Sequence, residues 1–424
     1  MLHFFHTSDW HLGQFFYHHS RHYEHECFLQ WLLEQLEQHQ PDALLIAGDI
    51  FDVVNPSTTA LKQLNQFIAA AHQKVSHLQI LMIAGNHDSG HRLEQVEPLL
   101  AKYNAHVVGI IEWQDDNTLN LDKLLRPIYN AQQQICAWCI ALPYLRPAEI
   151  TGYGQDYQDT AQATQALYQQ LIEEAQRRKT PEQSLLLMTH AHMQGGTSSD
   201  SERPIVVGNA EALSTSLFHP DIQYVALGHL HCPQYIEQEH IRYSGSPIPL
   251  SFSEVHYKHQ VVKVQLEPQT QARIESLPVP RRVPLFKIKG KLTEVLDKVK
   301  NLEACNPLPL AQQAFVDIEY SSDTPPPPDF RQQIEAALPK DNYRLVRLSR
   351  MARPQVKASG SAQPVASMEA PTPLNLFQQL WQKQGYQDDQ QVTKDFQQLF
   401  AQAEHHDQSS PSLTRPPDSQ PDTP

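Results

Sequence analysis

The stretch Ile80-Leu81-Met82-Ile83-Ala84-Gly85-Asn86-His87-Asp88 joins an apolar run to a cluster of polar side chains. Its first five residues form a short continuous apolar segment, which is typical of a strand buried on both faces. The amide, imidazole and carboxylate groups follow at once, so they would lie at the carboxyl end of that strand. In open α/β sheets ligands bind at this edge, and the stretch therefore predicts a functional site there.

Four other segments of the chain repeat this arrangement. The apolar runs are Leu2–His6, Ala43–Ala47, Ser184–Met188 and Tyr224–Leu227. The polar segments that follow are Thr7-Ser8-Asp9-Trp10-His11, Gly48-Asp49, His190-Ala191-His192 and Gly228-His229-Leu230-His231. A short motif such as Asp-x-His is easily met by chance, but five such segments in this order favour a single shared site.

The intervening sequence predicts helices between the first three strands. From Tyr23 to Gln38 the apolar residues recur at a helical spacing, and from Leu61 to Ala71 they do so again. Alternation of strand and helix predicts a parallel βαβ core and an α/β fold. Further along we expect a strand pair around Ile135–Leu142 and a helix over Thr160–Arg178. Ile241–Phe252 and Val261–Leu266 are expected to be antiparallel strands of a second sheet.

The polar segments offer more ligands than one metal ion requires. A catalytic zinc site uses three protein ligands and an open position. The candidate ligands here are Asp9, His11, Asp49, Asn86, His190, His229 and His231. Two ions roughly 3.5–4 Å apart could share Asp49 and clamp an in-line phosphoryl displacement. His192 could replace His190, although His190 follows its apolar run directly.

Two neighbouring residues are candidates for catalysis rather than for metal binding. His87 could protonate the departing alkoxide, and Asp88 could set the tautomer of the His87 ring. Other histidines are expected in a surface loop or helix, although some could line the substrate groove. These are His3, His6, His18, His19, His22 and His25.

Composition bounds the class of protein. The chain has 424 residues, room for two or three domains, and five cysteines without a spacing suited to a disulfide framework. It lacks an 18-residue apolar stretch and a secretory pattern at its start, so we expect a soluble, cytoplasmic protein with no membrane contact.

The net charge of −14 is unlike that of a nucleic-acid binder. However, 281–300 and 331–357 each carry seven basic and two acidic residues, a local balance of +5. Each could be a DNA-binding surface or merely a solvated face.

Three stretches of the chain resemble a known family. They are Ala84-Gly-Asn-His-Asp-Ser89, Ser199-Asp-Ser-Glu-Arg-Pro204 and Tyr243-Ser-Gly-Ser-Pro-Ile-Pro-Leu-Ser-Phe252. With the five polar segments, they resemble the calcineurin-like metallophosphoesterases and, more narrowly, the SbcD family of bacterial nuclease subunits. The resemblance covers residues 1 to 290 well and the rest loosely. It implies a two-sheet sandwich flanked by helices, with a small α+β capping domain and a C-terminal helical docking element.

The resemblance also implies a role for each site residue. Asp9, His11 and His231 would hold one ion, Asn86, His190 and His229 the other, with Asp49 bridging. The ions would be manganese, a metal-bound hydroxide would attack in line, and His87 would be the general acid. A relative of this family has a histidine three residues after the bridging aspartate. Here that position is Asp52, which leaves His87 alone in the acid role.

The implied domains are a nuclease domain over 1–280, a capping domain over 281–353, a flexible linker over 354–373, a helical pair over 374–404 and a disordered tail over 405–424. The helical pair would dock on the coiled coil of an SbcC-type ATPase. Helices near 57–72 and 91–102 would form a homodimer, although the sheet beneath could claim their apolar face.

The sequence therefore predicts a metal-dependent DNA nuclease subunit. The resemblance implies a 3′-5′ exonuclease on duplex DNA and an endonuclease on single strands and hairpins, acting in DNA repair, recombination and replication. The alternatives are a phosphomonoesterase or cyclic-nucleotide phosphodiesterase on the same fold, or a non-catalytic scaffold protein. A basic accessory domain and a docking tail speak against the first alternative, and the complete ligand set speaks against the second.

Overall fold

The computed structural model describes residues 1–114, 118–150, 160–202, 212–322, 325–351 and 391–396, together with positions 374, 377, 378, 380 and 381. These residues fall into two compact units. One comprises Met1–Lys289, Thr293–Ile318 and Pro327–Leu348, and the other comprises Gly290–Leu292, Glu319–Pro326 and the described residues from Ser349 on. The expected linker (354–373) and tail (405–424) lie outside the described residues.

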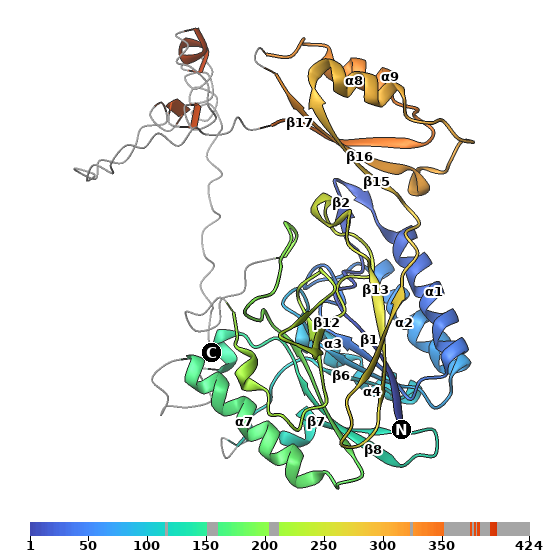
Figure 1. The fold of residues 1–424 in the computed structure, drawn as a ribbon, viewed down its shortest axis with the longest axis vertical. Coiled ribbons are helices and arrows are strands. Elements are labelled where there is room, and N and C mark those ends of the chain that lie inside the picture. Colours follow the sequence, from blue (N-terminus) through green and yellow to red (C-terminus); the bar gives the residue numbers. More distant parts are fainter. Residues whose placement is uncertain are drawn as a thin grey trace, which may run out of the picture. The chain divides into compact units, whose positions relative to one another are not determined.

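The first unit contains two six-stranded sheets (Figure 1). The first sheet has the order β14-β13-β1-β4-β5-β6. Its strands are β1 (Leu2–Thr7), β4 (Ala43–Ala47), β5 (Gln79–Ile83), β6 (Ala105–Val108), β13 (Gln260–Leu266) and β14 (Arg273–Pro278). β1, β4, β5 and β6 are parallel to one another. The predicted βαβαβ core is therefore confirmed.

Helices α1 (His22–His39) and α2 (Thr58–Lys74) make the crossovers of this core. Successive residues of a strand face opposite sides of a sheet. Accordingly, Leu44 and Ile46 of β4 pack in one cluster with the apolar stripes of α1 and α2, whereas Leu45 and Ala47 pack in a second cluster with the other sheet. The side chain of Ser57 accepts a hydrogen bond from the backbone N–H of Ala60, a cap that begins α2.

The second sheet has the order β11-β12-β10-β9-β8-β7. Its strands are β7 (Leu125–Tyr129), β8 (Ile135–Leu142), β9 (Ser184–His190), β10 (Tyr224–Gly228), β11 (Gln234–Ile236) and β12 (Gln238–Tyr243). Helix α7 (Thr160–Arg178) packs on it through Leu167 and Leu171. The sheets contact each other through β4 and β5 on one side and β8, β9 and β10 on the other.

One predicted pairing is wrong. Residues 241–252 and 261–266 do not form neighbouring strands of the second sheet. β12 runs parallel to β10 in that sheet, whereas β13 runs antiparallel to β1 in the first sheet. The irregular segment between β12 and β13 crosses from one layer to the other, and the apolar pattern of a strand does not say which sheet it joins.

Two of the histidines expected at the surface are buried. His6 lies on β1, with its Nδ1 atom 3.0 Å from the hydroxyl of Tyr224. His25 lies on α1, three residues before Phe28, and so belongs to the stripe that faces the core. His18 and His22, in contrast, are exposed as expected.

Short elements connect the layers. They are β2 (Phe15–Phe16), β3 (His19–Ser20), α3 (Gly90–Gln95), α4 (Glu97–Leu100), η1 (Ala101–Tyr103), α5 (Leu121–Leu124), α6 (Pro147–Ile150), η3 (Thr215–Leu217) and η4 (Phe252–Glu254). β2 and β3 form a hairpin of their own.

A smaller α+β element follows β14. It consists of β15 (Leu285–Lys291), α8 (Leu292–Lys300), η5 (Leu310–Gln312), β16 (Ala314–Ser321), α9 (Phe330–Ala337) and β17 (Tyr343–Arg350), with strand order β15-β16-β17. Its Phe315 is fully buried in a cluster with Phe16 and Phe252 of the sandwich. The guanidinium of Arg21, also fully buried, lies 5.0 Å from the ring centre of Phe16.

The described positions after Met351 are helical at 374, 377, 378, 380, 381 and 391–396. The rings of Phe377 and Phe396 stack with their centres 4.1 Å apart. Among the described helices of the chain, none is both long and apolar enough to cross a membrane.

Candidate metal centre

The predicted ligands come together at the carboxyl ends of five strands. Asp9 and His11 follow β1, Asp49 follows β4, and Asn86 follows β5. His190 is the last residue of β9, and His229 and His231 follow β10. Asn86 is half-buried and the other six side chains are buried. Within each sheet, parallel strands place their carboxyl ends at one edge, and the packing of β4 and β5 against β9 and β10 brings the two sets of groups together.

Asp49 stands at the centre of the cluster. Its Oδ2 atom lies 3.5 Å from Nε2 of His11 and also 3.5 Å from Nε2 of His190. Its Oδ1 atom accepts a hydrogen bond from the backbone N–H of His87 at 2.8 Å. One carboxylate therefore faces an imidazole from β1 on one side and an imidazole from β9 on the other.

Asn86 links the histidines on the β9 and β10 side. Its Oδ1 atom lies 2.9 Å from Nε2 of His190 and 3.3 Å from Nδ1 of His229. Nδ1 of His190 donates a hydrogen bond to the backbone carbonyl of Ala47 at 2.9 Å, so Nε2 is the atom turned toward Asn86 and Asp49.

His192, the alternative ligand, is half-buried, and its ring centre lies 5.9 Å from that of His229. The geometry thus favours His190 over His192.

The remaining ligands gather around Asp9. Ligand atoms of Asp9, His11 and His231 lie within 4.8 Å of one another. The Asp9 carboxylate is oriented by the hydroxyl of Ser8 at 2.6 Å and by the backbone N–H of His229 at 3.0 Å.

One buried atom in the cluster supports metal binding independently of the family resemblance. Nε2 of His11 is buried and has no hydrogen-bond partner among the described residues, although it points toward Asp49. A buried polar atom without a partner is costly. A cation between these groups would satisfy it, and imidazoles with carboxylate oxygens suit a divalent transition metal.

The backbone around the cluster is strained. Asp9, His11, Asp49 and His229 have positive φ angles of 54°, 48°, 48° and 109°. Such conformations are rare for residues with a side chain and are found where a site requires them. Gly85 is needed for space, because a Cβ atom there would lie 2.1 Å from Oδ1 of Asp49.

The pKa is raised for two of the clustered histidines, whereas burial and the neighbouring His190 lower the pKa of His229 well below its ordinary value. Burial lowers the pKa of His190, but the carboxylates of Asp49 and Asp9 outweigh it and raise the pKa to about 9. Burial also lowers the pKa of His231. The hydrogen bond with Glu254 and the charge of that carboxylate outweigh burial and raise the pKa to about 9. Without ions, protons occupy these rings, and a metal ion would have to displace them.

His87 lies beside this cluster, its ring centre 4.7 Å from that of His11. Nδ1 of His87 donates to the backbone carbonyl of Asp52 at 2.7 Å, so Nε2 carries a transferable proton only when the ring is in its doubly protonated imidazolium form.

The prediction that Asp88 sets the tautomer of His87 is wrong. The carboxylate of Asp88 accepts hydrogen bonds from the backbone N–H groups of Ile50, Phe51 and Gly85, at 3.1, 2.9 and 2.9 Å. Burial and the charge of Asp49 raise the pKa of Asp88 to about 6. Asp88 thus fixes the two loops that carry Asp49 and Asn86.

Sequence reasoning missed several groups that surround the ligands. Nδ1 of His231 lies 2.8 Å from Oγ of Ser201 and 3.0 Å from Oε1 of Glu254. The guanidinium of Arg146 donates to the backbone carbonyl of Asp88 at 2.8 Å. Ser201 lies within a stretch that the family resemblance rests on, but nothing in its spacing indicates a contact with His231.

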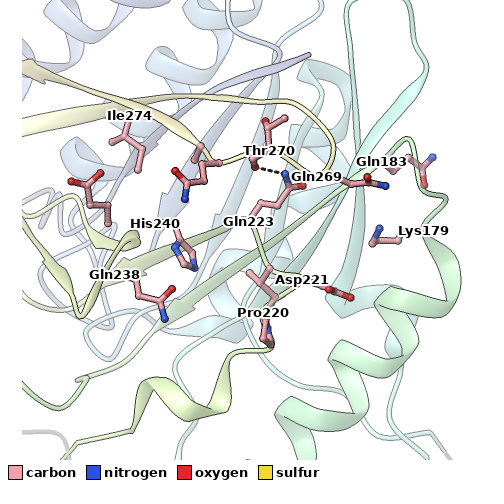
Figure 2. Close-up of a pocket in the computed structure, with 14 residues that line it drawn as sticks. Lys179, Gln183, Pro220, Asp221, Gln223, Gln238, His240, Gln269, Thr270 and Ile274 are labelled. Carbon is pink, nitrogen blue, oxygen red and sulfur yellow. Dashed lines mark hydrogen bonds between the residues drawn. The ribbon is translucent and has the colours of Figure 1, made fainter.

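A separate hollow of about 840 Å³ lies at the opposite ends of β9 and β10. Figure 2 shows its polar lining, with Gln223 donating to the backbone carbonyl of Thr270 at 2.9 Å. Gln183 and Gln223 directly precede the strands whose far ends carry His190 and His229. The hollow is therefore not part of the metal centre.

Two family models match parts of this chain. Residues 2–233 match the family model of the calcineurin-like phosphoesterases, and residues 281–385 match that of the Type 5 capsule protein repressor C-terminal domain. The chain is 35% identical over 381 residues to the SbcD subunit of nuclease SbcCD from Rhodobacter capsulatus, an overlap of 88% of this chain and 92% of the relative.

Two further relatives carry the same name. The SbcD subunit of nuclease SbcCD from Escherichia coli is 33% identical over 381 residues, which cover 87% of this chain and 91% of the relative. That of Bacillus subtilis is 31% identical over 322 residues, which cover 74% of this chain and 78% of the relative. Fold and site together define a calcineurin-like phosphoesterase, a metal-binding hydrolase of phosphoester bonds. Within that class, the chain belongs to the SbcD family of SbcCD nucleases.

Proposed function

We propose that the chain is the nuclease subunit of a DNA-cleaving complex and hydrolyses phosphodiester bonds at two divalent ions. Its relatives are named as nuclease subunits. The observation that carries the proposal is the position of Asp49, one carboxylate oxygen of which lies 3.5 Å from an imidazole on each side. A shared carboxylate between two sets of ligands is what a pair of ions requires.

We assign the ligands by their proximity. Asp9, His11 and His231 would hold one ion, and Asn86, His190 and His229 the other. Asp49 would bridge the two ions. The mixture of oxygen and imidazole donors is compatible with manganese, and we propose Mn²⁺ as the metal.

The ions, when bound, would activate a nucleophile and neutralise the charge that develops on the phosphoryl oxygens. The chain's own residues would do the rest. Asp49, through His11 and His190, and Asn86, through His190 and His229, would hold these rings in place relative to one another. His87, held through Nδ1 by the carbonyl of Asp52 at 2.7 Å, would act in its imidazolium form, give the Nε2 proton to the leaving sugar oxygen and become neutral.

Substrate and partner follow from the family. We propose 3′-5′ cleavage of duplex DNA and nicking of single strands and hairpins, in the cytoplasm, together with an SbcC-type ATPase. The docking element would be the helical residues near Phe377 and Phe396, whose rings stack on each other. Leu380 in this element is 59% exposed, which leaves an apolar side chain for a partner helix.

The basic segments contribute unequally to a DNA surface. In the first, Lys287, Lys289 and Lys291 of β15 are exposed. In the second, Arg344 is buried with its guanidinium 3.9 Å from the ring centre of Phe315, and Arg347 is paired with Asp317 at 2.6 Å. We propose the first segment, whose three lysines are exposed along one strand, for contact with phosphates.

We also propose a homodimer. Fewer apolar residues of the two candidate helices are exposed for its interface than the sequence indicated. Leu64, Phe67 and Ile68 of α2 are buried in the core of the sandwich. Leu61 and Leu99, on α2 and α4, are 38% and 64% exposed. These two leucines would be the apolar part of the interface.

The test is manganese-dependent cleavage of a labelled DNA hairpin by the purified chain, alone and with the ATPase partner. The Asp49→Asn variant should lose cleavage and bind fewer than two ions. Turnover of a chromogenic phosphate ester with no DNA cleavage under any condition would refute a nuclease in favour of a phosphomonoesterase. Fewer than two ions in the carefully loaded wild type would refute the dinuclear site.

A further inference from the structure

Glu254 is a buried acid that contacts one of the assigned ligands. Its side chain is fully buried, and its Oε1 atom lies 3.0 Å from Nδ1 of His231. An acidic side chain is rarely fully buried without a partner. The partner here is Nδ1 of the His231 ring, and Nε2 of the same ring is the atom that would face an ion.

The carboxylate of Glu254 is itself held in place. Its Oε2 atom accepts a hydrogen bond from the backbone N–H of Leu250 at 2.7 Å, and Oε1 accepts one from the hydroxyl of Ser199 at 2.8 Å. The hydroxyl of Ser201 contacts both Oε1 of Glu254 and Nδ1 of His231. These contacts fix the direction from which Glu254 approaches the imidazole.

The turn that carries Glu254 is anchored as well. Phe252, two residues earlier in η4, is buried in the cluster that contains Phe16 and Phe315. A carboxylate on a turn with a packed aromatic side chain can hold a ring at a fixed angle, which a mobile surface acid cannot do.

The two proposed ion positions differ in the groups that contact the second nitrogen of the ligand histidines. On the Asp9 side, His231 is backed by Glu254, and Nδ1 of His11 lies 3.2 Å from a carboxylate oxygen of Asp52. On the Asn86 side, His190 is backed by the neutral carbonyl of Ala47. A carboxylate behind an imidazole increases the electron density that the ring offers to a cation, and a carbonyl does so less.

We propose that Glu254 is a positioning residue that orients His231 toward the ion held with Asp9 and His11, and that it makes this ion the more tightly bound of the two. The inference rests on the proposed dinuclear function. It predicts a selective effect, because Glu254 contacts a ligand of one ion only. Loss of such a partner typically costs 10- to 100-fold in metal affinity.

The test is calorimetric titration of the metal-free full-length chain with Mn²⁺, comparing wild type, Glu254→Gln and Glu254→Asp. Wild type should bind two ions with unequal affinities. Glu254→Gln should weaken the tighter ion by about 10- to 100-fold and leave the other within about twofold. Glu254→Asp keeps the charge on a shorter arm, so its affinity should fall between those of the other two proteins.

A matched control is Glu24→Gln. Glu24 is also a buried glutamate of this unit, but its carboxylate pairs with Arg21. This variant should lower the unfolding midpoint and leave both metal affinities unchanged. It separates loss of a buried charge from loss of contact with a ligand.

The outcomes are distinct. Wild-type affinities in Glu254→Gln, with only a lower unfolding midpoint, would overturn the proposal and make Glu254 a structural residue. Equal weakening of both ions would overturn the selectivity. Should Glu254→Gln not fold, a folded Glu254→Asp protein with an unchanged tight site would overturn the proposal equally. A wild type that binds fewer than two ions would instead refute the proposed function.

Discussion

The backbone carbonyl oxygen of Asp52 lies 2.7 Å from Nδ1 of His87. The carboxylate of the same residue lies 3.2 Å from Nδ1 of His11. Asp52 therefore holds the proposed acid through its main chain and one proposed ligand through its side chain. This connection explains how His87 can keep a defined orientation beside the proposed ions.

His87→Ala should retain both ions and lose cleavage. The ring is outside the assigned ligand set, so its removal takes away only the proton donor, an effect of about 10²- to 10⁴-fold on kcat. Hairpin cleavage together with metal analysis of the same sample would measure both properties. The exposed His22→Ala variant should match the wild type. Loss of an ion from His87→Ala would mean that this histidine is a ligand.

His190→Ala and His192→Ala should behave differently, although the two residues are neighbours. Nε2 of His190 lies 3.5 Å from Oδ2 of Asp49 and 2.9 Å from Oδ1 of Asn86. Its loss should reduce the Mn²⁺ stoichiometry from two to one. His192→Ala should keep two ions. Metal content after desalting decides between them, and the reverse pattern would exchange the two roles.

The five strand ends could be predicted because each is a local pattern, an apolar run followed by polar residues. The strand order of a parallel core then follows from short right-handed crossovers. The sheet that Val261–Leu266 joins could not be predicted, since its partner on β1 lies more than 250 residues away in the sequence. That pairing is decided by tertiary contacts.

The direction in which a side chain points also could not be predicted from the sequence. Asp88 is adjacent to His87, yet its carboxylate turns to the backbone N–H groups of Ile50 and Phe51. Glu254 contacts His231 from 23 residues away, and its sequence neighbours give no sign of that contact. Contacts that orient a ligand come from loops folded over the site, and a single sequence does not reveal them.

Gly85→Ala should destabilise the protein and disturb the metal centre. The new Cβ atom would lie 2.1 Å from Oδ1 of Asp49 and 2.3 Å from its backbone nitrogen, so the Asp49 loop must move. Overpacking of this kind costs about 1–3 kcal/mol. Urea unfolding with and without Mn²⁺ measures the loss. At Gly195, an added Cβ meets nothing within 4 Å, but the φ of 83° is unfavourable for a residue with a side chain; Gly195→Ala should therefore lose some stability and keep full metal affinity. Unchanged metal binding in Gly85→Ala would show that the loop can adjust.

Acid should destabilise the sandwich partly through His6. Burial lowers its pKa to about 3, against a raising contribution from a backbone contact with Leu227. Between pH 6.5 and pH 3 the unfolded chain binds a proton at His6 that the folded chain does not. Stability is therefore complete above pH 6.5 and falls with pH by about 1.4 kcal/mol per unit.

The measurement is urea unfolding in the presence of a chelator at pH 6.5 and pH 5, for the wild type and His6→Gln. The loss of stability between the two pH values should be about 2 kcal/mol smaller in the variant. The exposed His18→Gln variant serves as the control and should lose as much as the wild type. An identical loss in His6→Gln and the wild type would contradict a neutral, buried His6.

Neutralising the exposed lysines of β15 should weaken DNA binding without affecting the metal centre. Lys287, Lys289 and Lys291 lie at alternate positions of one strand and so share one face of the sheet. Each phosphate contact contributes about 0.7–0.9 to the slope of log K against log salt. The triple glutamine variant should therefore reduce that slope by about 2–3, measured by fluorescence anisotropy with a labelled duplex and Ca²⁺ in place of Mn²⁺. Arg331→Gln, an exposed cation on α9 and outside β15, is the control for the loss of a single positive charge elsewhere on the surface. An unchanged slope in the triple variant would mean that these lysines form a solvated face, and that DNA is bound through the ions or through the ATPase partner.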